Sequence, residues 1–132
     1  MGAPRGYHHL AMRVKSFDTS VAFYTEVLGF KTGRSWGDPG KRAVMLEMAD
    51  GGCLEIFEGG SDKDGNQGET TLLHFALRVD DCDSLLESVR ASGAKITVEA
   101  KDVDIPSDPV YPVRIAFFEG PDREIVELFQ ER

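Results

Sequence analysis

The sequence contains few cysteines, no long apolar run and no excess of positive charge. Cys53 and Cys82 are the two cysteines in 132 residues, too few for a disulfide framework or a zinc knuckle, which suits a reducing compartment. No apolar stretch approaches the roughly 20 residues that span a bilayer, and no charged leader precedes an apolar segment. These absences predict a cytoplasmic protein.

The negative charge of the chain disfavours some classes of partner. A formal net charge of −8 and a pI near 4.8 leave no basic surface for phosphate backbones, so we expect neither nucleic acid nor an anionic membrane as a partner. A length of 132 residues with 41% hydrophobic content allows one compact domain. We therefore predict a single domain over residues 1–132.

One sequence pattern occurs twice in the chain. The segment from His9 to Val14 (HLAMRV) returns as His74 to Val79 (HFALRV), with His, Ala, Arg and Val in register. After each copy, apolar residues recur at helical spacing and stop before a glycine, Gly29 or Gly93, which is a common residue at a helix end. The repeat predicts a strand followed by a helix in each half of the chain.

Each half then continues with three strand-like segments. Glycine, proline and aspartate supply turns between them. The expected strands are residues 31–36, 41–48 and 53–58 in the first half and residues 95–100, 113–119 and 124–130 in the second. The pattern predicts an α+β fold with two tandem βαβββ modules, residues 7–58 and 71–130, joined by a linker at residues 59–70.

Four polar side chains share one face of the predicted strands. Side chains alternate across a strand, so His9 and His74 lie on the face opposite their apolar neighbours, which would receive the helix. By the same alternation, Glu55 and Glu127 also point away from the helix. A carboxylate in such apolar surroundings requires a partner.

Two imidazoles and two carboxylates form a suitable ligand set for one divalent first-row metal ion. Taken singly, a histidine on a strand is more often structural than a ligand, but the duplicated spacing and the shared face favour a metal site. The sequence therefore predicts a site formed by His9, Glu55, His74 and Glu127. The register of the repeat selects His9 over His8, which we expect to face the helix side.

These modules resemble the vicinal oxygen chelate superfamily, which includes glyoxalase I, methylmalonyl-CoA epimerase, extradiol dioxygenases and fosfomycin or bleomycin resistance proteins. The resemblance extends from about Tyr7 to Phe129 and includes the segment FYTEVLGF, residues 23–30, and the turn at residues 120–122. Arg123 follows at a position where the superfamily commonly has glycine. The resemblance implies a cupped eight-stranded mixed sheet with helices on its outer face, and a homodimer.

Within the superfamily, the His, Glu, His, Glu set resembles that of glyoxalase I (lactoylglutathione lyase). This implies Ni, Zn or Co, with Fe or Mn as alternatives. It also implies a lyase or isomerase that moves a proton through a metal-bound enediolate of a small carbonyl substrate, with or without a thiol conjugate. Glu127 would be the base and Glu55 the second catalytic carboxylate, although the reverse assignment stays open. A related epimerase, a non-haem iron dioxygenase and a drug-sequestering resistance protein are the alternatives.

Residues outside the metal set bear on the substrate. Arg13 and Arg78 share the strand faces of the histidines, and they either bind substrate carboxylates or form structural ion pairs. Glyoxalase I usually carries an asparagine shortly after the first metal glutamate, and the run from Glu55 to Gly60 has none. The proline-rich residues 102–112 predict either a loop that closes over the site or a rigid connection.

Overall fold

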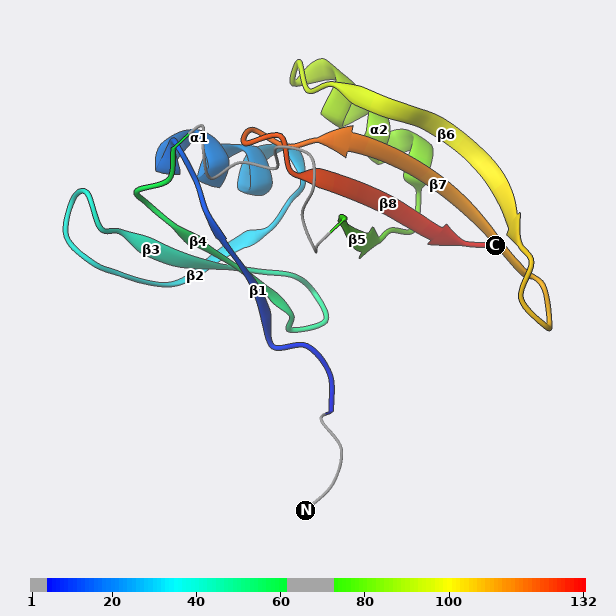
Figure 1. The fold of residues 1–132 in the computed structure, drawn as a ribbon, viewed down its shortest axis with the longest axis horizontal. Helices are drawn as coiled ribbons and strands as arrows, with labels where there is room; N and C mark the ends of the chain where they lie inside the picture. Colours follow the sequence, from blue (N-terminus) through cyan, green and yellow to red (C-terminus); the bar gives the residue numbers. More distant parts are fainter. Residues whose placement is uncertain (1–4, 62–72) are drawn as a thin grey trace. The chain divides into compact units, whose positions relative to one another are not determined.

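A computed structural model of the chain describes residues 5–61 and 73–132. These residues fall into two compact units, one before and one after residues 62–72. Each unit contains a four-stranded mixed sheet with a helix on one face (Figure 1). The predicted α+β fold with two tandem βαβββ modules is confirmed, and its eight strands divide equally between the two sheets. The predicted linker at residues 59–70 lies largely outside the described residues.

The first module has the predicted order of elements. It contains β1 (His9–Arg13), α1 (Phe17–Ala22), the π-helical turn η1 (Phe23–Val27), β2 (Lys31–Trp36), β3 (Ala43–Glu47) and β4 (Cys53–Phe57). The strands lie in the order β1-β4-β3-β2, with β1 parallel to β4 and the other neighbours antiparallel. The side chain of Ser16 caps α1, and Gly29, with φ of +80°, follows the helical segment in the left-handed conformation that glycine adopts readily.

The second module repeats this topology. It contains β5 (Phe75–Arg78), α2 (Cys82–Ala91), β6 (Ile96–Ile105), β7 (Tyr111–Glu119) and β8 (Ile125–Glu131). The strands lie in the order β5-β8-β7-β6, and β5 is parallel to β8 as β1 is to β4. Asp81 caps α2 by accepting a hydrogen bond from the backbone of Ser84. The two halves of the sequence therefore adopt one fold twice.

Strand β6 is longer than the sequence predicts. Residues 102–105 continue the strand and pair with β7, so the connection is confined to residues 106–110 and the predicted loop at residues 102–112 is wrong. Arginines from elsewhere in the chain neutralise the aspartates of this segment: Arg114 Nη1 lies 3.0 Å from Asp102 Oδ1, and Arg132 Nη1 lies 3.6 Å from Asp104 Oδ1. These pairs make an acidic strand tenable, and they are not visible in the local sequence.

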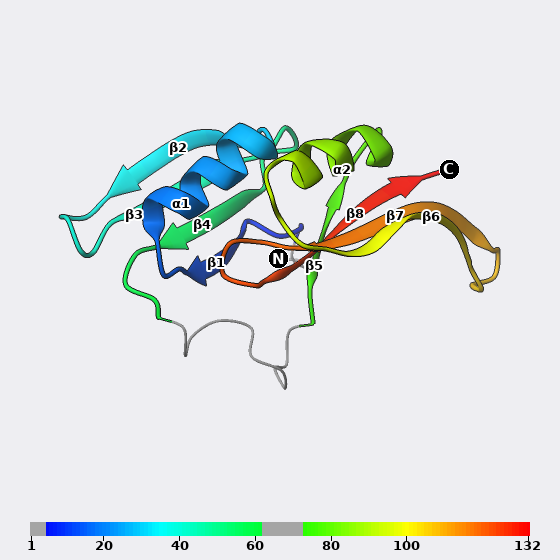
Figure 2. The same ribbon diagram turned by 90° about the horizontal axis from the view of Figure 1, so that it is seen from above.

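Each sheet buries one face beneath its helix (Figure 2). Four of the side chains that the alternation assigned to this face, those on β4 and β8, are at most 2% exposed: Leu54, Ile56, Val126 and Leu128. We call the other face of each sheet its open face. The open face of the first module carries His9, Ala11, Arg13, Glu55 and Phe57, and that of the second carries Ala76, Arg78, Glu127, Phe129 and Glu131.

Candidate metal centre

The first histidine and glutamate meet on the open face of the first module. His9 Nε2 lies 3.4 Å from Glu55 Oε1. Strands β1 and β4 are parallel neighbours, and their register places Glu55 opposite Ala11, two residues beyond His9. The methyl group of the alanine leaves space above the strand, so the imidazole and the carboxylate can approach each other.

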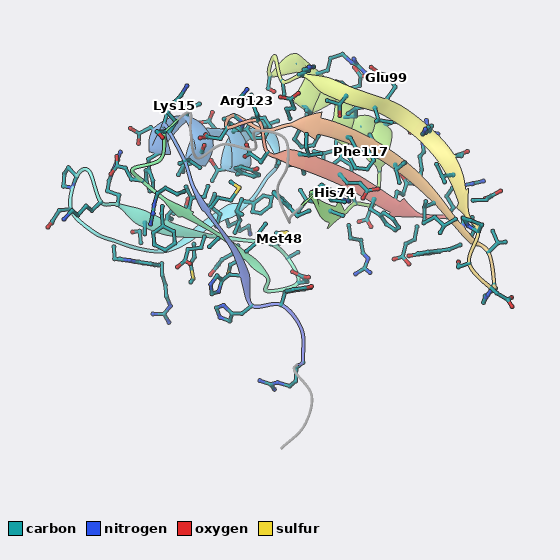
Figure 3. All side chains as sticks on the ribbon, in the orientation of Figure 1. Lys15, Met48, His74, Glu99, Phe117 and Arg123 are labelled. Atoms are coloured by element: carbon teal, nitrogen blue, oxygen red, sulfur yellow. The ribbon has the colours of Figure 1, made fainter. Side chains whose placement is uncertain are left out.

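The second pair repeats this geometry in the second module. His74 Nε2 lies 3.1 Å from Glu127 Oε1, and Ala76 lies opposite Glu127 in the parallel pairing of β5 with β8. The imidazole of His74 also meets the ring of Phe117 edge-on, with ring centroids 5.2 Å apart (Figure 3). The structure thus places each predicted histidine against the predicted glutamate of its own module.

Both glutamates are buried while the histidines stay accessible. Glu55 and Glu127 are each 8% exposed, whereas the side chains of His9 and His74 are 39% and 36% exposed. Burial raises the pKa of Glu127 above its usual value, and the neighbouring His74 partly opposes this effect. Each pair therefore presents a carboxylate on the sheet and an imidazole at the edge of solvent.

The spacing of the pairs fits the ligands of a metal ion. Two ligands bound about 2.0 to 2.2 Å from one ion lie roughly 3.0 to 3.5 Å apart in tetrahedral or octahedral geometry, which includes the observed distances of 3.4 and 3.1 Å. Within either described module, no group of three or more histidine, cysteine, aspartate or glutamate side chains could hold a metal. The predicted site combines both pairs, and their meeting at one ion stays a prediction.

His8 is exposed and precedes β1. Its carbonyl accepts a hydrogen bond from Cys53 N of β4 at 3.1 Å, and the expectation that its side chain faces the helix side stays a prediction. Its Nδ1 lies 2.9 Å from Nδ1 of His9. This contact holds the imidazole of His9 by the nitrogen that does not face Glu55, the arrangement that orients histidines as metal ligands.

The two predicted substrate arginines have different surroundings. The guanidinium of Arg13 lies over the ring of Phe57, 5.8 Å from the centroid, and no carboxylate pairs with it within the described part of its module. Arg78 donates from Nε to Glu131 Oε1 at 3.0 Å. One arginine is therefore stacked on an aromatic ring and the other is in an ion pair.

Sequence reasoning missed two residues that flank the glutamates. Met45 and Phe117 lie opposite Glu55 and Glu127 in the antiparallel pairings of the two modules. Each precedes its glutamate by the same number of positions in the repeat. That equal spacing is a signal that could have identified them as apolar neighbours of the carboxylates.

A cavity of about 450 Å³ in the first module lies away from these pairs. Its lining includes Phe17 and Val21 of α1 together with Thr32 and Val44 of the sheet, which places it between the helix and the sheet. Arg42 at its edge pairs with Asp18 and Glu58. Its position on the helix side separates this cavity from the open face and its His/Glu pair.

Comparison with known proteins identifies the family. The sequence profile of the Glyoxalase/Bleomycin resistance protein/Dioxygenase superfamily matches residues 6–128. The chain belongs to this superfamily. Lactoylglutathione lyase of Haemophilus influenzae is 34% identical over 130 residues, which cover 94% of this chain and 91% of that protein. Lactoylglutathione lyase of Escherichia coli O157:H7 is 31% identical over 130 residues, with the same coverage of both chains.

A solved structure adds to these similarities. The trypanothione-dependent glyoxalase I of Leishmania major has a TM-score of 0.74 and 26% identity, covering 97% of this chain and 88% of that chain. The resemblance to the vicinal oxygen chelate superfamily is confirmed, and the similarity to lactoylglutathione lyases supports a glyoxalase I-like enzyme. None of the helices in residues 5–61 and 73–132 is long and apolar enough to cross a membrane.

Proposed function

We propose that the protein is a metal-dependent lyase or isomerase of the glyoxalase I type, which acts on the adduct of a small 2-oxoaldehyde and a thiol. The observation that carries this proposal is the duplicated contact between an accessible imidazole and a buried carboxylate, at 3.4 and 3.1 Å. A buried carboxylate is costly unless it binds a cation or a strong donor. Two buried carboxylates at equivalent positions carry this desolvation cost, which supports a role in metal binding for both pairs.

The proposed ligands of the metal are His9, Glu55, His74 and Glu127. Two imidazoles and two carboxylates suit nickel, cobalt or zinc, with iron or manganese as alternatives. The two pairs would come from one chain or from two chains of a homodimer, and either arrangement uses the same four side chains. When bound, the ion would polarise the carbonyl of the substrate and stabilise negative charge on its oxygens.

Glu127 is the proposed base. Burial raises its pKa, which makes its carboxylate a stronger acceptor of a proton from carbon. It would take the proton from the carbon that bears the sulfur and the hydroxyl and return it to the adjacent carbonyl carbon. The hydroxyl proton would move to the former carbonyl oxygen, so that one C=O bond forms as the other is lost. The product thioester is an isomer of the adduct, so the reaction needs no redox partner. Glu55 is the proposed second carboxylate.

The open face of the first module supports a substrate with an anionic end. Arg13 shares this face with His9 and Glu55 and lies over Phe57. A guanidinium in this position can bind a carboxylate in bidentate fashion. Since similar proteins are named lactoylglutathione lyase, glutathione is the first thiol to test. Its hemithioacetal with methylglyoxal is the first candidate substrate.

Metal analysis and turnover together test this function. Protein purified without added metal should contain nickel, cobalt or zinc, and it should convert the methylglyoxal hemithioacetal of glutathione to a thioester. Glu127→Gln should lower turnover by about a hundredfold or more, as expected for loss of a general base. Glu26→Gln, at an exposed residue of η1, is the matched control. Full activity in Glu127→Gln would exclude Glu127 as the base, and bound iron with oxygen uptake would favour a dioxygenase.

A further inference from the structure

The open faces of the two modules differ at one pair of equivalent positions. Glu131 lies four residues after Glu127 on β8, and the residue four positions after Glu55 is Gly59. A carboxylate therefore stands at the end of the second open face where the first has no side chain. Arg13 and Arg78 also occupy equivalent positions. The two modules can therefore be compared to see what the additional carboxylate does to its arginine.

Glu131 joins a polar cluster with Arg78 and Tyr111. One carboxylate oxygen accepts from Arg78 Nε at 3.0 Å, and the other accepts from the hydroxyl of Tyr111 at 2.5 Å. The ring of Tyr111 packs on Phe129, with centroids 5.8 Å apart. The hydroxyl of Tyr111 and then the charge of Arg78 hold the pKa of Glu131 below its usual value. The carboxylate is therefore ionised at neutral pH, and it forms an ion pair with the guanidinium of Arg78.

The cluster of Arg78, Tyr111 and Glu131 lies within reach of a substrate bound beside Glu127. Arg78 lies opposite Phe129 on β8, two residues beyond Glu127, which is about 7 Å at 3.3 Å per residue. A thiol of tripeptide size spans roughly 10 Å when extended. A conjugate whose carbonyl lies beside Glu127 could thus present a carboxylate to Arg78 if the arginine were available.

We propose that Glu131 is a specificity-determining residue that neutralises Arg78, so that a ligand carboxylate gains nothing there. This inference rests on the proposed function and narrows the substrate class to thiol conjugates whose binding does not depend on a carboxylate at Arg78. Placing an unfavourable charge against a competing ligand is a common means of selectivity. Because Arg78 and Glu131 are 77% and 47% exposed, their pair contributes little to stability, and Glu131→Gln should fold normally.

Ligand binding tests this role without relying on turnover. The ligands are S-methylglutathione, which has two carboxylates, and its diethyl ester, which has none, measured by calorimetry on the full-length protein. Glu131→Gln should lower the Kd of S-methylglutathione by about threefold to fivefold, the value of one exposed charge pair, and leave that of the diester unchanged. The double variant Arg78→Gln/Glu131→Gln should lose this gain.

Glu99→Gln is the matched control, because it removes an exposed ion pair with Arg90, a residue of α2. It should change neither Kd. Equal shifts for both ligands in Glu131→Gln, no shift at all, or a gain that persists without Arg78 would each overturn the inference. The wild-type protein's failure to isomerise the methylglyoxal adduct would refute the proposed function instead, and the binding comparison would still decide the role of Glu131.

Discussion

Replacing Glu127 with glutamine should stabilise the protein without metal and destabilise it with metal. Glu127 is 8% exposed and lies between Ala76 and Phe117, with His74 at 3.1 Å. An ionised carboxylate in this position is poorly solvated, whereas the amide of similar shape carries no charge. At pH 8 in a chelator, we expect Glu127→Gln to be more stable by about 1 kcal/mol, which raises the Tm of a chain of this length by roughly 3 to 4 °C.

Added metal should make the wild-type protein more stable than Glu127→Gln. A divalent ion at about 100 times its Kd stabilises the wild-type protein by about 2.7 kcal/mol. The variant has lost one proposed ligand, so it should gain much less from the same concentration. The wild-type protein should then be the more stable of the two. Thermal unfolding in chelator and in nickel, followed by circular dichroism, measures both orders with the same samples.

The pH dependence of stability in the metal-free proteins tests independently whether Glu127→Gln is stabilising. Burial raises the pKa of Glu127 in the folded protein. A raised carboxyl pKa contributes stability below the unfolded value of 4.5, and this contribution is lost as the pH rises through the folded value. The advantage of Glu127→Gln should therefore be small near pH 4.5 and grow toward pH 8.

Two results would refute this reasoning. A metal-free Glu127→Gln protein that is less stable than the wild type at pH 8 would show that the carboxylate is satisfied without a cation. Equal stabilisation of both proteins by metal would show that Glu127 is not a ligand. Glu26→Gln, which changes an exposed carboxylate of the first module, should show neither effect and controls for the change in net charge.

Three further perturbations test parts of the structure. Arg123→Gly should stabilise the protein by about 0.5 to 1 kcal/mol in urea unfolding, because Arg123 has φ of +66° and glycine adopts this conformation without strain; a loss of stability would contradict this. Arg42 holds the pKa of Glu58 at about 2, below its usual value of 4.5. The stability that wild type has over Glu58→Gln should thus be present above pH 4.5 and shrink as the pH falls toward 2; a constant difference would argue against the ion pair. His8→Phe keeps a ring beside His9 and removes the 2.9 Å contact. It should weaken metal binding about threefold to tenfold in a calorimetric titration, and unchanged affinity would exclude an orienting role.

The sequence predicts the strand faces correctly because alternation is a local property of the backbone. Glu55 and Glu127 lie on the faces that residue parity assigns to them, and their neighbours in each strand are buried on the other side. The contact of each histidine with its own glutamate depends further on the parallel register of two strands far apart in the chain. The repeat suggested that register without determining it.

Long-range ion pairs account for the errors and omissions in the second module. Residues 102–105 were included in the predicted connection because the segment that they begin is proline-rich, and the ion pairs of Asp102 and Asp104 with Arg114 and Arg132 come from other segments. In the same way, the pairing of Arg78 with Glu131 joins residues 53 positions apart. Local composition cannot distinguish an arginine that awaits a ligand from one that already has a partner. In the described part of the second module Arg78 pairs with Glu131, whereas Arg13 lies over the ring of Phe57.

The internal repeat separates what the two modules share from what they do not. Histidine, a small alanine and a buried glutamate recur at the same register positions in both. A larger side chain at Ala11 or Ala76 would occupy the space that lets the imidazole reach the carboxylate, so the alanines belong to the same functional unit as the proposed ligands. The residues around Arg13 and Arg78 differ between the modules, since Gly59 stands at the position equivalent to Glu131. If the proposed function is correct, the repeated residues would supply the chemistry common to both modules, and the residues at which the copies differ would determine selectivity for the substrate.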